Sequence, residues 1–403
     1  MKERIFLLLL AVSSILVGCD NNGSIDGPVM ERPSDTPVIL SAGGVFDGDI
    51  TVKQNTPATR ASVDNISQLG KVGVFMLAGK KTNINGSDLA QTPDWSVSLD
   101  NADYATTTHG TYWENLSCSV DPVTGRMSVD AGQDYVWYYP ITSWYAYDFY
   151  GYHPYQNEYD VTKDANGNSR ITVDFKIDGT QDILWGRSEK KNDPFAYSAR
   201  YFRNSPDTVV KMNFKHKLTQ FQFYLVPQTK NETAEATFNG IRNLSVKKIT
   251  MHRVATNLRM TLAESNNITA EDCVIEPVPG DEQRVDVLLN DRDGALQPVP
   301  FQTKIENGLE VADTVRIGDC IMVCPDVKTH YMSMVICKTD DVDSEYHSEK
   351  EMTIKLSGDK FFEAGKIYKI YVKASGVTEI ALEATVEDWE EAEEDENLNF
   401  DID

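Results

Sequence analysis

The 403-residue chain has few histidines and lacks the residue groupings on which most catalytic sites are built. Its six histidines are scattered, and no two lie at the spacing of a paired metal site. The sequence has neither the G-x-S-x-G turn that exposes a nucleophilic serine nor the glycine-rich loop that binds nucleotide phosphates. We therefore expect no enzyme activity, no metal and no cofactor.

Basic residues are also fewer than acidic ones, since the chain has 38 lysines and arginines and 62 aspartates and glutamates. The resulting net charge of −24 repels phosphate backbones, so we expect no nucleic acid partner. Hydrophobic residues make up 41% of the chain and charged residues 25%, which is typical of a folded globular protein.

Long apolar runs are missing except near the N-terminus, where residues 5–17 follow Lys2 and Arg4. This run is short for a membrane span, and it ends in LVGC at Cys19. Small residues just before the end of such a run mark a processed secretory signal. The segment 1–19 resembles a bacterial lipoprotein signal, which implies that Cys19 becomes the N-terminus and carries a lipid in the outer membrane. The alternative is an ordinary signal peptide with an incidental cysteine.

Beyond Cys19 the chain has only five cysteines, an odd and sparse set that does not form a disulfide framework. We expect most of them to be small buried hydrophobic residues.

Short runs rich in β-branched and aromatic residues, separated by turn residues, dominate the chain from residue 69 onward. Turns are predicted at 121–126 and at 164–169, where Asn166-Gly167 suits positive φ. The pattern predicts an all-β protein, and its length predicts two sandwich domains that divide near residues 203–209. Extended runs are expected at 71–77, 127–140, 170–178, 210–226, 244–252, 284–289, 331–337, 351–357 and 366–375.

A dense aromatic run, YVWYYPITSWYAYDFYGYHPY, occupies residues 135–155. Such residues can stack on sugar rings or on a partner protein, or they can fill the inside of a sandwich. We favour the second interpretation.

Several segments together resemble the fimbrillin family of Bacteroidetes, the pilins that include fimbrial subunits and fimbrillin-like lipoproteins. The similar segments are the Tyr-rich strand YDFYGYHPY, DILWG at 182–186, FKHKLTQFQFYL at 214–225, FFEAGKIYKIYV with the following VTEIALEATVEDWEE, and ATRA at 58–61.

The resemblance implies two transthyretin-like β-sandwich domains, at 61–206 and 207–389. Residues 20–60 would form a tether and an N-terminal strand that together act as a propeptide. It also implies cleavage between Arg60 and Ala61 by an arginine-specific protease, and polymerisation by donor-strand exchange.

The last segment, 390–403, is an acidic linker followed by NLNFDID, in which Leu398, Phe400 and Ile402 alternate with polar residues. This period-2 pattern predicts a strand with one apolar face. We expect it to be the donor strand for the next subunit, and the alternative is a frayed tail.

These features predict a structural fimbria subunit at the cell surface that supports adhesion. Its expected partners are copies of itself or other fimbrillins, the maturation protease, the membrane and possible surface ligands. The alternative is a non-polymerising surface lipoprotein that binds carbohydrate or protein. A stalk, tip or anchor role, the adhesion ligand and glycosylation stay open at this point.

Overall fold

The structure, a computed structural model, describes residues 33–44, 63, 66–81, 95, 114–130, 137–140, 145–203, 208–227, 244–268, 270–280, 282–286, 299–300, 302–306, 308–325, 327–338, 350–376, 379–388 and 400–402. Within these ranges the chain is built from strands, with one short helix, α3 (Ala199–Arg203), and one 3-10 turn, η1 (Ile66–Gln68). No helix in these ranges is long and apolar enough to cross a membrane. The predicted all-β class is confirmed, whereas the transthyretin-like character of the domains stays a prediction.

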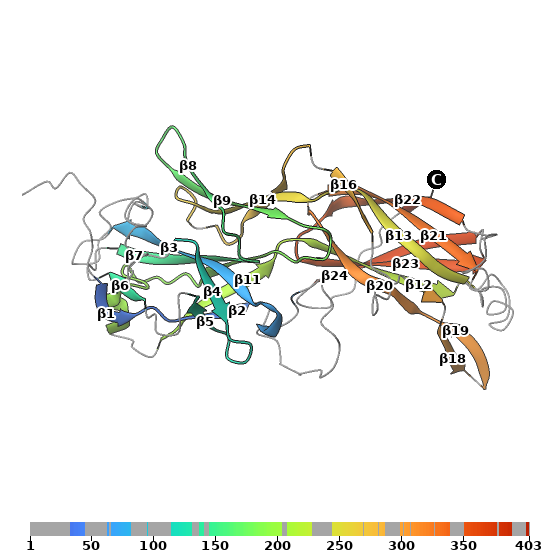
Figure 1. The fold of residues 1–403 in the computed structure, drawn as a ribbon, viewed down its shortest axis with the longest axis horizontal. Helices are drawn as coiled ribbons and strands as arrows, with labels where there is room; N and C mark the ends of the chain where they lie inside the picture. The colour runs from blue at the N-terminus through green and yellow to red at the C-terminus, as the bar shows by residue number, and fades with distance from the viewer. Residues whose placement is uncertain are drawn as a thin grey trace, which may run out of the picture.

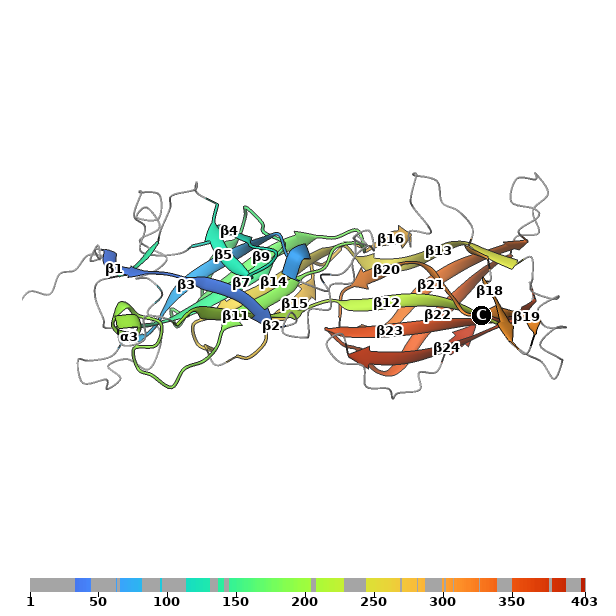
Figure 2. The same cartoon turned by 90° about the horizontal axis from the view of Figure 1, so that it is seen from below.

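The molecule is elongated and has two lobes along its long axis (Figures 1 and 2). The first lobe contains a closed barrel in the order β10-β11-β2-β5-β4-β3-β7. Its strands are β2 (Leu40–Gly44), β3 (Lys71–Lys81), β4 (Leu116–Val120), β5 (Arg126–Val129), β7 (Tyr145–His153), β10 (Leu184–Ser188) and β11 (Val210–His216). A two-stranded sheet of β1 (Pro33–Pro37) and β6 (Tyr138–Pro140) also belongs to the N-terminal part of the chain.

A second, four-stranded sheet covers the outside of this barrel, in the order β15-β14-β9-β8. Its strands are β8 (Asp160–Lys163), β9 (Ser169–Lys176), β14 (Asn257–Glu264) and β15 (Val274–Pro277). The cover explains why the run VGVFMLA, residues 72–78, is continuously apolar. Val74 and Met76 on β3 face the barrel core, whereas Phe75 and Leu77 pack against the covering sheet.

The second lobe is built around two further sheets, β20-β12-β23-β24 and β16-β13-β21-β22-β25, with β17 paired to β13. The strands are β12 (Thr219–Pro227), β13 (Leu244–Ala255), β16 (Glu282–Asp286), β17 (Val299–Pro300), β20 (Val315–Val323), β21 (Val327–Lys338), β22 (Lys350–Phe362), β23 (Lys366–Gly376), β24 (Glu379–Asp388) and β25 (Phe400–Ile402). A separate hairpin consists of β18 (Gln302–Glu306) and β19 (Leu309–Asp313). On β12, Phe221, Phe223 and Leu225 are buried while the residues between them are more exposed, as expected of a strand in a sandwich.

The predicted continuous run 210–226 is divided in two by Lys217 and Leu218. Its first half, β11, pairs with β10 and β2 in the barrel, and its second half, β12, pairs with β20 and β23 in the second lobe. Strand pairs therefore cross the expected domain boundary at residue 207, and β14 returns from the second half of the chain to pair with β9. The division at 207 stays a prediction.

Both predicted turns close hairpins. Residues 121–125 connect β4 to β5, and Asp164 to Asn168 connect β8 to β9, with Gly167 at a φ of 81°. Asp164 accepts hydrogen bonds from the backbone of Asn166 and Asn168, so its carboxylate caps the turn.

Candidate assembly surfaces and the junction between the lobes

Strand β2 lies upstream of the candidate cleavage site and is an integral part of the barrel. It pairs in parallel with β11, from Val210↔Leu40 to Phe214↔Gly44, and antiparallel with β5. Leu40 is fully buried, and Val38 and Ala42, two residues on either side, are 8% exposed. The backbone of Ile39 accepts a hydrogen bond from the Val210 N–H. We call the space that β2 fills between β11 and β5 the β2 slot.

Loss of β2 would leave the facing edges of β11 and β5 without their partner strand and would expose an apolar strip. Unpaired edges of this kind bind another strand readily. The burial of Leu40 alone contributes about 1.5–3 kcal/mol, so an unfilled slot would favour a replacement with the same alternation of apolar residues.

The C-terminal tail is paired within its own chain. Strand β25 runs antiparallel to β22, with Ile402 opposite Ile354, Asp401 opposite Lys355 and Phe400 opposite Leu356. It forms the outer strand of the six-stranded sheet. The predicted strand at Phe400 and Ile402 is therefore present, and its use by a neighbouring subunit stays a prediction. The other predicted site residues, Cys19, Arg60, Ala61 and Leu398, lie outside the described residues.

Two of the segments that resemble the fimbrillin family, DILWG and FKHKLTQFQFYL, come together where β11 leads into the second lobe. Asp182 of DILWG and His216 of FKHKL are both buried, and His216 Nδ1 lies 2.8 Å from Asp182 Oδ2. The backbone N–H of Val63, three residues after Arg60, donates to the same oxygen at 3.1 Å. Sequence reasoning treated the histidines as scattered and missed this group, although both residues belonged to segments that it had singled out.

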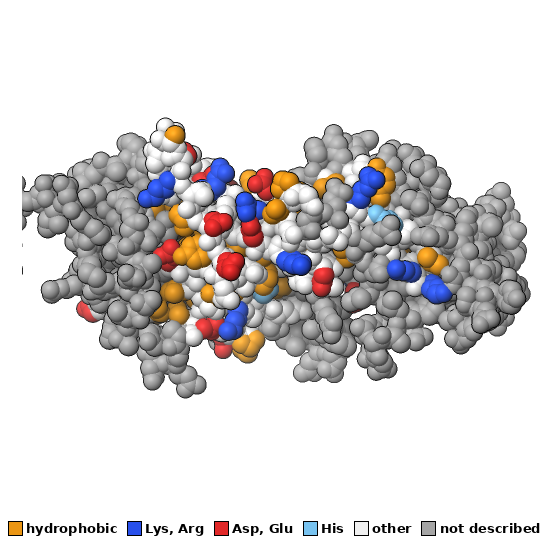
Figure 3. Space-filling model, turned by 45° about the horizontal axis from the view of Figure 1, so that its top comes forward, with side chains coloured by type: hydrophobic (Ala, Val, Ile, Leu, Met, Phe, Trp, Pro, Cys, Tyr) orange, Lys and Arg blue, Asp and Glu red, His pale blue; other side chains and the backbone are white. Residues whose placement is uncertain are grey.

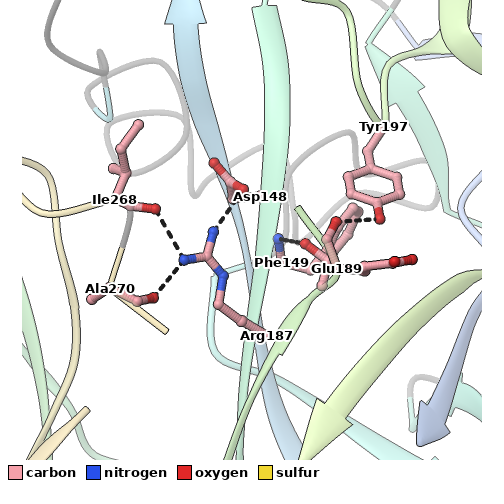
Figure 4. A network of polar contacts seen from close by, with 8 residues as sticks. Asp148, Phe149, Arg187, Glu189, Tyr197, Ile268 and Ala270 are labelled. Atoms are coloured by element: carbon pink, nitrogen blue, oxygen red, sulfur yellow. Dashed lines mark hydrogen bonds and ion pairs between the residues drawn. The ribbon is translucent and has the colours of Figure 1, made fainter. Parts of the chain in front are cut away.

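Arg187 on β10 is the centre of a second polar network, drawn in Figure 4. Its Nη1 donates to the carbonyl oxygens of Ile268 (3.0 Å) and Ala270 (2.6 Å), and its Nη2 lies 3.2 Å from Asp148 Oδ1 on β7. The guanidinium also lies 5.2 Å from the centre of the Tyr150 ring. Burial raises the pKa of Asp148, and the Arg187 charge opposes that shift.

Ile268 and Ala270 lie in the connection between β14 and β15. Two lysines, one on β11 and one just after it, also bind this connection. Lys217 Nζ lies 2.5 Å from Asp272 Oδ1, and Lys215 Nζ donates to the Glu271 carbonyl at 3.2 Å. Together with Arg187, these contacts fasten the hairpin that returns from the second half of the chain to the barrel.

The aromatic run is part of the core, as predicted. Tyr139, Tyr147, Phe149 and Tyr152 are fully or almost fully buried. Tyr139 stacks on Phe202 of α3 with 5.1 Å between the ring centres. A ring that packs inside the lobe cannot stack on a sugar in solution, so these residues do not support a carbohydrate site.

The cysteines behave largely as expected. Cys118, Cys320 and Cys324 are buried and unbridged, and the partly exposed Cys273 is also unbridged. Burial raises the pKa of the Cys273 thiol to about 12. In the part of the chain that the structure describes, no group of three histidine, cysteine or acidic side chains could hold a metal ion.

Acidic and basic side chains are interspersed over the described part of the surface on the face shown in Figure 3. Two exposed ion pairs join β9 to β14, Arg259 with Asp174 at 2.7 Å and Arg170 with Glu264 at 2.6 Å. They align the covering sheet across strands, and each is worth little stability because water screens it.

His330 on β21 gives the second lobe a sensitivity to acid. Its ring packs between Phe221 and Phe362, its Nε2 has no hydrogen-bond partner in the described residues, and burial lowers its pKa to about 4. The unfolded chain takes up this proton near pH 6.5 and the folded chain only near pH 4, so stability falls as pH drops through that window. We expect a loss of roughly 2–3 kcal/mol at pH 4.5.

Urea unfolding of the wild type and of His330→Leu at pH 7 and pH 4.5 measures this effect. The variant should lose less stability between the two pH values than the wild type, by about 2–3 kcal/mol. Equal losses in both proteins would show that His330 does not cause the acid sensitivity. His252→Gln is the control, because that residue is only partly buried and is hydrogen-bonded to Ser333.

The sequence profile described as fimbrillin-like matches residues 59–389. No curated protein matches the chain.

The solved structures that match the chain include three from surface or fimbrial proteins. A putative cell adhesion protein from Bacteroides uniformis is 15% identical and has a TM-score of 0.42, covering 89% of this chain and 100% of its own. A fimbrial protein from Bacteroides vulgatus is 12% identical with a TM-score of 0.43, covering 87% and 99%. The fimbrial anchor protein Mfa2 from Porphyromonas gingivalis is 8% identical with a TM-score of 0.27, covering 89% and 100%.

At such low identities and TM-scores, these likenesses carry no inference about function, and the family assignment rests on the profile. That profile spans both lobes and includes the Asp182–His216 pair, the Arg187 network and the strand β11 that borders the β2 slot. The chain therefore belongs to the fimbrillin-like family.

Proposed function

We propose that the chain is a structural, non-enzymatic fimbria subunit, exported as a lipoprotein, cleaved between Arg60 and Ala61, and assembled by strand exchange. Membership of the fimbrillin-like family supports a fimbrial role at the cell surface, as a subunit or an anchor. The observation that carries the finer proposal is the position of β2. This strand precedes the cleavage site, yet it fills a place in the barrel that a strand from outside could take.

In this proposal the tail of one subunit fills the β2 slot of the next. Strand β2 buries Leu40 and Ala42, and Val38 just before the strand is also buried, so the three lie two residues apart. Leu398, Phe400 and Ile402 of the tail have the same spacing. Because successive side chains of a strand point to opposite faces, a strand with this period presents all three to one apolar strip.

The tail tests the proposal. Deleting residues 397–403 should leave a folded chain that is cleaved and accepts a neighbour's tail but donates none. Such a chain ends a filament, so adding it to the full-length protein should shorten filaments in proportion to its mole fraction. Electron microscopy after cleavage with an arginine-specific protease measures their length.

Asn399→Ser is the matched control, because this position alternates with the apolar residues of the tail. It should leave filament length unchanged. Filaments of normal length from the truncated chain alone would show that the donor strand lies elsewhere.

A second candidate function is favoured by one observation, the pairing of β25 with β22 in the same chain. A chain that keeps its tail in this place would be a surface lipoprotein that does not polymerise, or an anchor that retains its lipid. This candidate predicts no filaments from any variant and a mature protein that still begins at Cys19.

Lipid attachment is tested separately. Cys19→Ser should abolish acylation, since the lipid is carried on the cysteine sulfur, and the protein should move from the detergent phase to the aqueous phase on partitioning. Cys273→Ser, at a partly exposed and unbridged cysteine, is the control and should partition like the wild type. A Cys19→Ser protein that still enters the detergent phase contradicts lipidation at this residue.

A further inference from the structure

The buried carboxylate of Asp182 has one oxygen in use and one oxygen unused. Its side chain is 1% exposed. Oδ2 accepts a hydrogen bond from the Val63 N–H and lies 2.8 Å from His216 Nδ1. Oδ1 is buried and has no hydrogen-bond partner in the described residues. A buried carboxylate oxygen without a partner is costly, so the group is set to bind a further donor.

We propose that Asp182 binds the α-ammonium group that cleavage creates on Ala61, an inference that rests on the proposed maturation site. Hydrolysis of the Arg60–Ala61 amide by water leaves a carboxylate on Arg60 and an ammonium on Ala61. The ligand is thus the chain's own new N-terminus.

The position of Val63 brings the new N-terminus within reach. The Val63 N–H already binds the Asp182 carboxylate at 3.1 Å, and the nitrogen of Ala61 lies two residues upstream. Two residues of chain span at most about 7 Å. Nearby backbone nitrogens along a chain can bind one anion together, the arrangement known as a nest.

Cleavage changes the nitrogen of Ala61 from a neutral amide with one N–H into a cation with three donors. A charged donor forms shorter and stronger hydrogen bonds to a carboxylate than a neutral one does. The ammonium could therefore satisfy Oδ1, which the described residues of the precursor leave unpaired.

Two lysines near this carboxylate are engaged with other aspartates. Lys217, next to His216, is paired with Asp272, and Lys71 is paired with Asp130. His153, on the other side of β10, binds the Lys71 carbonyl through Nδ1; burial lowers its pKa, although the Asp182 charge acts in the opposite direction. Of the basic side chains that the structure describes, only His216 contacts the Asp182 carboxylate, through Oδ2, so Oδ1 is left for a cationic donor.

The site lies where the two lobes join. From His216 the chain passes through Leu218, which accepts a hydrogen bond from the Gly365 N–H, to Thr219, whose hydroxyl donates to the Glu363 carbonyl. An ion pair at Asp182 would fix the start of the mature chain at this junction at the moment when β2 is freed.

The test uses a full chain that can be cut without the natural protease. Pro57→Ile, Ala58→Glu and Thr59→Gly place Ile-Glu-Gly-Arg, the recognition sequence of factor Xa, directly before Ala61. Factor Xa then yields the native Ala61 N-terminus. Trace acetylation across the pH range in which α-amines titrate, followed by mass spectrometry, reports the pKa of that amine.

A free α-amine titrates near 7.7–8.0. We expect the value in the cleaved chain to be at least about one unit higher. At neutral pH this corresponds to acetylation about tenfold slower than in the same chain carrying Asp182→Asn. Glu158→Gln, at an exposed acidic residue, is the matched control and should leave the slow acetylation unchanged.

An α-amine of the cleaved Asp182 chain that titrates in the ordinary range overturns the inference, and this measurement does not require that Asp182→Asn fold. An elevated value that persists in Asp182→Asn overturns it too, because another group would then be responsible. The proposed function is judged on a different readout. Cleaved chains that form no filaments contradict strand exchange, whatever the pKa of the amine.

Discussion

Arg60→Ala is expected to abolish filament formation while leaving a folded precursor. Without the cut, β2 remains covalently joined to the barrel, and its effective concentration at the slot exceeds that of any neighbour's tail. Leu40 then stays buried between β11 and β5. The measurement is electron microscopy of the variant after incubation with an arginine-specific protease, together with N-terminal sequencing of the product.

Arg203→Ala is the control, because Arg203 is exposed at the end of α3 and lies after the barrel strand β10. It should be cut to give Ala61 at the N-terminus and should assemble like the wild type. Filaments from Arg60→Ala in wild-type amounts would mean that release of β2 is not the step that permits assembly.

Arg187→Met is expected to cost about 3–5 kcal/mol of the free energy of unfolding. The change leaves Asp148 without its cation, and it removes the donor to the carbonyls of Ile268 and Ala270. The Arg187 side chain is only 11% exposed, so water cannot replace these bonds fully. Urea unfolding followed by tryptophan fluorescence measures the loss.

The chain offers a matched control in Arg259→Met. Arg259 also pairs with an aspartate across two strands, but the side chains of Arg259 and Asp174 are 42% and 52% exposed. That change should cost about 0.2–1 kcal/mol. Adding Asp148→Leu to Arg187→Met should restore part of the stability, because the double variant leaves no buried charge without a partner. Equal costs for the two single variants would contradict a structural role for the Arg187 network.

Much of the secondary structure could be predicted because it depends on local patterns. The hairpin at Asn166-Gly167 and the strand β9 after it follow from turn chemistry and from period-2 alternation. The dense aromatic run was also predicted to lie in the core, since alternating rings fill the inside of a sandwich.

Sheet membership could not be predicted, because it depends on contacts between residues far apart in the chain. Residues 210–226 form one apolar pattern, yet Phe214 lies in the barrel and Phe221 in the second lobe. The return of β14 to β9 pairs residues such as Arg259 and Asp174, which are 85 positions apart. Local propensity carries no information on such pairings.

The candidate site shows the same limit. Alternation predicted a strand at Phe400 and Ile402, but the pattern does not say which edge the strand binds, and the structure pairs it with β22. Asp182 and His216 are 34 residues apart, and their contact depends on the register of β10 against β11. Sequence resemblance drew attention to both segments without indicating that they meet.

The passage from β13 into β14 has a mechanical consequence. Strand β13 belongs to the second lobe and β14 to the first, and only the buried Thr256 separates them, held by the Ile177 N–H at 2.8 Å. Tension applied between the β2 slot and the tail would run along this ribbon and load the ladders to β21 and β9 in shear. When a strand ladder is loaded in shear, many hydrogen bonds must break together. A flexible hinge between the lobes would instead let the hydrogen bonds break one after another. In a fimbria assembled as proposed, this ribbon would make each subunit a stiff link that resists extension.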